Sequence, residues 1–220
     1  MNIMKWFRRR KAEDVVPAHL PNAEEAAQRF WERWFELVPV VSAALGDGEP
    51  HRVSDELRDL VNALHPDLMF SLEQGHMAMY ALVITGQEDP RLRPYTDAWI
   101  KAAPPSDMVW EFHDSVPPVP DPTEVVVNLG EVKMRLGDYR VVAQVDGDVV
   151  DVAVYHPALA ELTDQQRQTM TFLPLDVTLG ERLAGERLRR VETAQLEPEG
   201  TISLLELRSL VRELAGVSDA

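Results

Sequence analysis

Four aromatic residues fall within six positions of this chain, in the run Phe30-Trp-Glu-Arg-Trp-Phe35. The 220-residue sequence holds 5 Trp, 4 Tyr and 6 Phe, so this run contains more than a quarter of them. Aromatic side chains bury large areas and dominate protein cores and interfaces. The run therefore predicts either a central packing element of the fold or a recognition surface.

The residues around the run favour a packing helix. Asn22 followed by two glutamates is typical of a helix N-terminus. Pro39 is expected to kink or end this helix. The apolar residues recur at helical spacing, at Phe30, Trp34, Leu37, Val38 and Val41.

The four aromatic residues cover more than half of the helix circumference, so they cannot all face one narrow seam. We predict that Trp31 lies nearest the edge of the apolar stripe. Trp31 is therefore the residue of this run that we expect to be available for binding a partner.

Two further helices and three strands are predicted before residue 117. The helices are expected at 54–64, capped by Ser54 and stopped by Pro66, and at 90–103. The strands are expected at 68–73, 77–85 and 109–113. The segment 77–85 is apolar on both faces, which is typical of a strand covered on two sides. A proline-rich bridge, residues 117–122, then marks an internal boundary.

Beyond the bridge, period-two alternation predicts an antiparallel meander over 125–155, with a hairpin turn at Asp146-Gly147-Asp148. Thr163 and Gln166 form a capping-box pattern for a helix that ends near Leu179. Pro174 leaves a strand over 169–173 as the alternative. We expect an edge strand within 183–192 and an amphipathic helix over 204–214.

Together these elements predict an α+β fold. An antiparallel sheet, made of the hairpin 68–85 and the meander 125–155, is packed by helices mainly on one face. Residues 1–21 are expected to form a basic tail and linker. Residues 22–216 are expected to form a single α+β domain, with two sub-halves joined by the bridge 117–122.

The charge of the chain limits its partners. The formal net charge is −15, from 37 acidic and 22 basic residues. Such a charge disfavours nucleic acid and favours another protein with a basic surface. The absence of cysteine excludes disulfides and thiolate zinc sites. No apolar run has the length of a signal-peptide core or a membrane span, so we expect a cytoplasmic protein.

The first eleven residues reverse this charge locally, with five basic residues and no acidic one. Basic residues beside apolar ones can contact an anionic membrane surface. The alternative is a solvated tail. The residues that would make the membrane contact are Lys5, Trp6, Phe7, Arg8, Arg9 and Arg10.

Candidate catalytic residues are few, because the common phosphate-loop, nucleophile-elbow and zinc-helix motifs do not occur. Glu111 and His113 are two positions apart on one face of a predicted strand, and Asp114 follows them. This trio, with Glu181 as a further member, has the side chains to hold a metal or to polarise a water. The alternative is a strand end with a solvated polar face. No cofactor and no bound metal are expected.

Four short segments resemble a family of bacterial cytoplasmic α+β proteins of unknown function. The family pairs an FWxWF helix with an "ITAxG"-like strand end, an "AP…W" segment and a later "LGE". Here Thr85-Gly86-Gln87 departs from the strand-end pattern, and the aromatic run has a different spacing. The segments that carry the resemblance are Phe30–Phe35, Ala81–Gly86, Ala102–Pro104 with Trp110, and Thr178–Glu181. The resemblance implies a fold and names no reaction or cofactor.

Three functions follow from these observations. The first is a non-enzymatic protein-binding or adaptor module with an acidic surface, of an immunity or regulator type. The second is a metal-assisted hydrolase that uses Glu111, His113 and Asp114. The third is a peripheral membrane protein tethered by its basic N-terminus. We favour the first, because acidic charge and excess aromatic residues are both typical of a binding protein.

Overall fold

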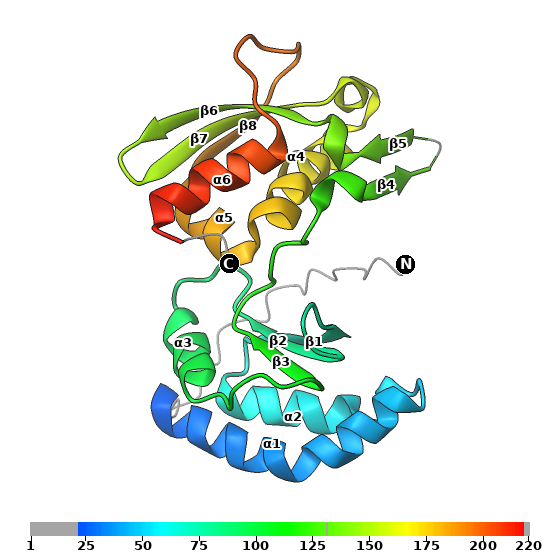
Figure 1. Cartoon of the computed structure of the whole chain (residues 1–220), viewed down its shortest axis with the longest axis vertical. Coiled ribbons are helices and arrows are strands. Elements are labelled where there is room, and N and C mark those ends of the chain that lie inside the picture. The colour runs from blue at the N-terminus through cyan, green and yellow to red at the C-terminus, as the bar shows by residue number, and fades with distance from the viewer. Residues whose placement is uncertain (1–21, 131, 218–220) are drawn as a thin grey trace.

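The computed structural model describes residues 22–130 and 132–217. They form an α+β fold with six α-helices and three small sheets whose strand pairs are mostly antiparallel. Figure 1 shows two layered halves, one below and one above a single crossing segment. The N-terminal half extends to β3, and the C-terminal half begins with β4.

The N-terminal half places two long helices under a three-stranded sheet (Figure 1). Strand β2 is central, antiparallel to β1 and parallel to β3. Its buried residues on both faces confirm the prediction of a covered strand for 80–85. The predicted strand began at residue 77, but Met77 and Met79 lie before β2 and are exposed. The elements are α1 (Ala23–Gly46), α2 (Ser54–Leu64), β1 (Met69–Gln74), β2 (Tyr80–Thr85), α3 (Arg93–Lys101) and β3 (Trp110–His113).

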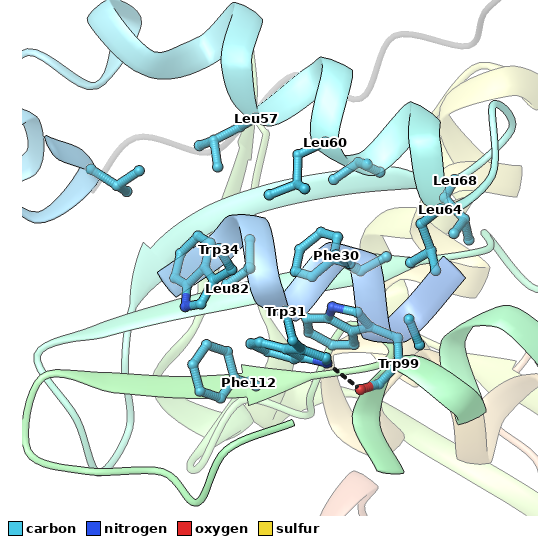
Figure 2. Close-up of a cluster of buried hydrophobic side chains, with 14 of the residues drawn as sticks. Phe30, Trp31, Trp34, Leu57, Leu60, Leu64, Leu68, Leu82, Trp99 and Phe112 are labelled. Carbon is cyan, nitrogen blue, oxygen red and sulfur yellow. Dashed lines mark hydrogen bonds between the residues drawn. The ribbon is translucent and has the colours of Figure 1, made fainter. Parts of the chain in front are cut away.

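The aromatic run forms the centre of this half (Figure 2). Phe30, Trp31 and Trp34 are buried among residues from α2, α3 and the sheet. Trp31 stacks on Trp99 with ring centroids 5.1 Å apart, and its Nε1–H donates to the Trp99 carbonyl oxygen at 2.8 Å. The ring of Phe112 meets Trp31 edge-on at 4.8 Å. The core interpretation of the run is therefore confirmed for these three residues.

The prediction that Trp31 lies at the exposed edge is wrong. Trp31 is only 4% exposed, whereas Phe35 is 58% exposed. The reason is that α3 and β3 supply Trp99 and Phe112, which together cover the flank of α1 that carries Trp31. The sequence of a helix shows its apolar stripe, but it does not show which side of the helix a neighbouring element covers.

Of two predictions about helix ends, that for Pro39 is confirmed as a kink rather than an end, and that for Ser54 needs correction. Helix α1 does not end at Pro39 but continues to Gly46, with a visible bend (Figure 1). A proline cannot donate to the carbonyl four residues earlier, so it favours bending where packing holds both segments helical. Ser54 begins α2 rather than capping it, and its Oγ donates to the Pro50 carbonyl oxygen at 3.1 Å.

The C-terminal half packs three helices against a second three-stranded sheet, in which β7 lies between an antiparallel β6 and a parallel β8. Strands β4 and β5 form a separate two-stranded ribbon, so the predicted meander is divided between two sheets. The elements are β4 (Val126–Leu129), β5 (Val132–Arg135), β6 (Arg140–Asp146), β7 (Val149–Tyr155), α4 (Asp164–Leu179), α5 (Glu181–Arg187), β8 (Leu188–Thr193) and α6 (Leu204–Ala215).

Several predictions for this half are confirmed. The hairpin turn falls at Gly147-Asp148, between β6 and β7. Helix α4 has the complete capping box of Thr163 and Gln166 and runs through Pro174, so the alternative strand over 169–173 is wrong. The predicted edge strand exists over Leu188–Thr193, but residues 181–187 are helical. Short 3-10 helices occur at Pro50–Val53, Pro122–Glu124, Leu136–Asp138 and Pro157–Glu161.

Each half has its own buried apolar cluster. The first contains residues between Ala26 and Phe112, and the second contains residues between Val127 and Val211. The bridge 117–122 crosses between them (Figure 1). Contacts between the halves are therefore made outside both apolar cores, in the region where β2 ends and α5 begins.

Candidate functional site

A cavity of about 490 Å³ lies at the junction of the two halves. One wall comes from the end of β2 and the turn after it, a second from the start of the bridge, and a third from α4 and α5. Most of the wall is apolar, but three carboxylates also line it. The lining residues are Thr85, Gln87, Glu88, Val116, Pro117, Val119, Thr169, Phe172, Leu173, Asp176, Val177 and Glu181.

Glu181 joins the three walls. Its carboxylate accepts hydrogen bonds from the Thr85 hydroxyl and from the backbone N–H of Glu88 at 3.0 Å. It also accepts from the N–H of Val116 at 3.0 Å. Glu181 is the first residue of α5, where the helix dipole favours a negative charge. One side chain of the C-terminal half thereby holds both the β2 end and the bridge.

The turn after β2 has an uncommon backbone. Gln87 and Glu88 both have positive φ angles, 50° and 64°, although neither is glycine. The Gln87 N–H donates to the Thr85 hydroxyl oxygen at 2.8 Å, while the Glu88 N–H is held by Glu181. Each such residue costs on the order of 1 kcal/mol, and such strain is concentrated at functional sites. The strained turn places the Glu88 side chain at the cavity.

Close packing of the bridge fixes the opposite wall. Gly180, between α4 and α5, has a φ of 77°. A Cβ there would lie 2.8 Å from Cδ of Pro118 and 2.9 Å from its backbone nitrogen. The Val119 N–H donates to the Val177 carbonyl oxygen at 2.9 Å. Only glycine allows the bridge to approach the helix junction this closely.

The cavity raises the pKa of two of its carboxyl groups, Asp176 and Glu88. Burial raises the pKa of Asp176 to about 7, with further contributions from the negative charges of Glu88 and Glu181. Burial also raises the pKa of Glu88, and repulsion from Glu181 adds to this while Arg93 opposes it. Near neutral pH Asp176 is therefore only partly ionised.

No lysine or arginine is among the described residues that line the cavity. The nearby arginines pair with other acids. Arg93 contacts Glu186 at 2.9 Å, and Arg182 contacts Asp97 at 2.7 Å and also Asp114. The negative charge of the cavity is thus left without a basic side chain in its wall.

The predicted trio of Glu111, His113 and Asp114 is only partly brought together. His113 Nε2 lies 3.0 Å from Glu111 Oε1, as expected for two residues on one strand face. Asp114 instead pairs with Arg182 at the junction of the halves. Within residues 22–130 and 132–217, no group of three or more histidines and carboxylates has an arrangement that could hold a metal.

Glu111 instead binds the backbone of the turn between β1 and β2. Its carboxylate accepts hydrogen bonds from the backbone N–H groups of His76 at 2.8 Å, Met77 at 2.8 Å and Ala78 at 3.0 Å. Burial opposes ionisation of Glu111, but these bonds and that from His113 outweigh it and lower its pKa to about 2. Glu111 therefore stabilises the turn between β1 and β2.

The N-terminal candidates Lys5, Trp6, Phe7 and Arg8–Arg10 lie outside the described residues. In the part of the chain that the structure does describe, no helix has the length and hydropathy needed to cross a membrane.

The sequence analysis did not identify Glu88 and Asp176. One is a single acidic residue in a turn and the other a single acidic residue on an amphipathic helix, and neither belongs to a motif with a recognisable spacing. A partial signal did exist. Two of the four segments that carry the family resemblance end in Thr85-Gly86 and in Glu181, and the structure joins them through the hydrogen bond between Thr85 and Glu181.

Comparison with protein-family models, with curated proteins and with solved structures finds no match to this chain.

Proposed function

We propose that this protein is a non-enzymatic protein-binding module, and that the cavity between its halves receives a lysine or arginine side chain of a partner with a basic surface. The observation that supports this most directly is the set of three carboxylates, Glu88, Asp176 and Glu181, in a largely apolar cavity without a basic residue in its wall.

The apolar wall suits the aliphatic part of such a side chain. Val116, Val119, Phe172, Leu173 and Val177 would contact methylene groups, while the carboxylates meet the cationic end. Lysine and arginine side chains combine these two characters. The net charge of −15 adds long-range attraction for a basic partner and speeds association.

Asp176 makes the binding depend on pH. A cation binds the ionised form better, so binding near neutral pH draws a proton off Asp176. Affinity is therefore expected to rise as the pH increases through about 7, which is the pKa of this group. A cavity that bound only through apolar contacts has no such dependence.

The test is calorimetric titration of the full chain with acetyl-Leu-Arg-amide. The matched probe is acetyl-Leu-citrulline-amide, which has nearly the same shape without the charge. We expect the arginine probe to bind with a Kd on the order of 1 mM or tighter, with proton release at near-neutral pH, and the citrulline probe to bind at least about tenfold more weakly.

Two variants test whether the arginine probe binds in the cavity. Asp176→Asn is expected to weaken the arginine probe about tenfold and to remove most of the proton release. Asp59→Asn, at an exposed position on α2, is the matched control and leaves binding unchanged. Equal affinity for the two probes, or no effect of Asp176→Asn, contradicts the proposal.

A further inference from the structure

Four apolar side chains are exposed at the end of the first sheet that is remote from the cavity. Met77 is 92% exposed and Met108 is 87% exposed, and Met79 and Val109 are exposed as well. Single exposed apolar residues are common, but neighbouring ones indicate an interaction site. We call these four residues the methionine patch.

Backbone hydrogen bonds make the patch continuous. The Met79 N–H donates to the Met108 carbonyl oxygen at 3.0 Å. The next residue, Tyr80, donates to the Val109 carbonyl oxygen at 2.9 Å. The turn after β1 and the segment before β3 therefore lie side by side, although about thirty residues separate them in the sequence.

The exposure of the methionines does not come from a loosely held loop. The three hydrogen bonds to Glu111 fix the backbone of residues 76–78 from inside the sheet. Asp107 fixes the other segment, because its carboxylate accepts from the N–H groups of Val109 at 2.7 Å and Trp110 at 2.8 Å. Two carboxylates thus hold the backbone that presents the apolar side chains.

The charged side chains of the segments that form the patch are all acidic. The two segments that form it, residues 69–85 and 102–115, contain no lysine or arginine. Glu73 and Asp107 are acidic residues in them that are not buried. Glu111 is only 5% exposed and is bonded inside the turn, and Asp114 pairs with Arg182 at the junction of the halves. An apolar surface with acidic neighbours complements an apolar surface with basic neighbours. Methionine, which is flexible and polarisable, suits a surface that packs against a helix of variable sequence.

From these observations we propose that the methionine patch is a docking surface for a basic amphipathic helix of another protein. The apolar face of such a helix packs on Met77, Met79 and Met108, and its lysines or arginines face Glu73 and Asp107. The surface is separate from the cavity. The patch adjoins Tyr80 and the cavity adjoins Thr85, which are opposite ends of β2 and about 17 Å apart at the strand rise.

The experiment uses the full chain with isotope-labelled methionine methyl groups, observed by NMR. The probe is a synthetic peptide of about 14 residues, made of leucine and lysine in amphipathic helical order. We expect the methyl signals of Met77, Met79 and Met108 to move on titration. The signals of Met134 and Met170, which are fully buried in the second core, are expected to stay in place.

Variants test whether the peptide binds at the methionine patch, and a matched peptide tests whether binding depends on its positive charge. The double substitution Met77→Gln with Met108→Gln keeps side-chain size at two exposed positions, and it is expected to weaken binding at least about tenfold. Leu196→Gln, at an 82% exposed position in the other half, is the control and leaves binding unchanged. A peptide with glutamate in place of lysine is expected not to bind.

Three outcomes overturn the proposal. The first is an unchanged affinity in the double variant. The second is a glutamate peptide that binds as well as the lysine peptide. The third is movement of the patch methyl signals without peptide, either on raising the protein concentration or on deleting residues 1–11, because the occupant is then a second copy or the chain's own basic segment. Since Asp176→Asn is not expected to alter binding here, failure of this proposal is distinct from failure of the cavity proposal.

Discussion

Replacing Asp176 by asparagine is expected to stabilise the protein at neutral and alkaline pH. The folded structure raises the pKa of this carboxyl from 3.8 to about 7, chiefly through burial. Each unit corresponds to about 1.4 kcal/mol, so ionised Asp176 costs at most about 4 kcal/mol. Because the side chain borders an open cavity, water screens part of this cost, and we expect a gain of about 2–4 kcal/mol.

The sign of the effect follows from where the proton is bound. Asp176 loses its proton near pH 4 in the unfolded chain and near pH 7 in the folded one. Between these values only the folded state keeps the proton, so the free energy of unfolding decreases as the pH increases. Above pH 7 the whole cost is present. Asparagine does not ionise, so the gain is small near pH 4 and largest near pH 8.

Denaturant unfolding of both proteins at about pH 4 and about pH 8 measures this difference. The control is Asp59→Asn on α2, where the exposed carboxylate is expected to give no pH-dependent gain. Asparagine keeps the size of the side chain, so packing alone changes little at either pH. A variant that is no more stable than the parent at pH 8, or that gains equally at both pH values, refutes the reasoning.

Three further predictions concern packing and backbone. Trp31→Ala is expected to lower the free energy of unfolding by about 3–5 kcal/mol, whereas Phe35→Ala changes it by about 0.5 kcal/mol; equal effects in chemical denaturation contradict the observed burial. Glu111→Gln is expected to lower the free energy of unfolding by about 2–3 kcal/mol at pH 7. The lowered pKa of Glu111 stabilises the folded protein at pH values above the ordinary pKa of 4.5, so the difference disappears near pH 2. Gly180→Ala is expected to lower the thermal midpoint through its clash with the bridge; an unchanged midpoint contradicts that contact.

Local chemistry in the sequence predicts most of the elements. Asn22 caps α1, Thr163 and Gln166 form the capping box of α4, and the hairpin between β6 and β7 forms where expected. These features depend on residues a few positions apart, whose hydrogen bonds and apolar periodicity act within one element. The α+β class follows from the same local patterns.

The tertiary structure decided the rest, because it depends on contacts between distant residues. Trp31 is buried because α3 and β3 cover one flank of α1, and no pattern within α1 encodes that neighbour. Asp176 is an ordinary acid on α4 until Glu88 and Glu181, from separate elements, are brought close to it. Thr85 and Glu181 meet across 96 positions of sequence. The cavity and its charge therefore arise from the packing of two halves, whereas the helices and strands that build it are determined locally.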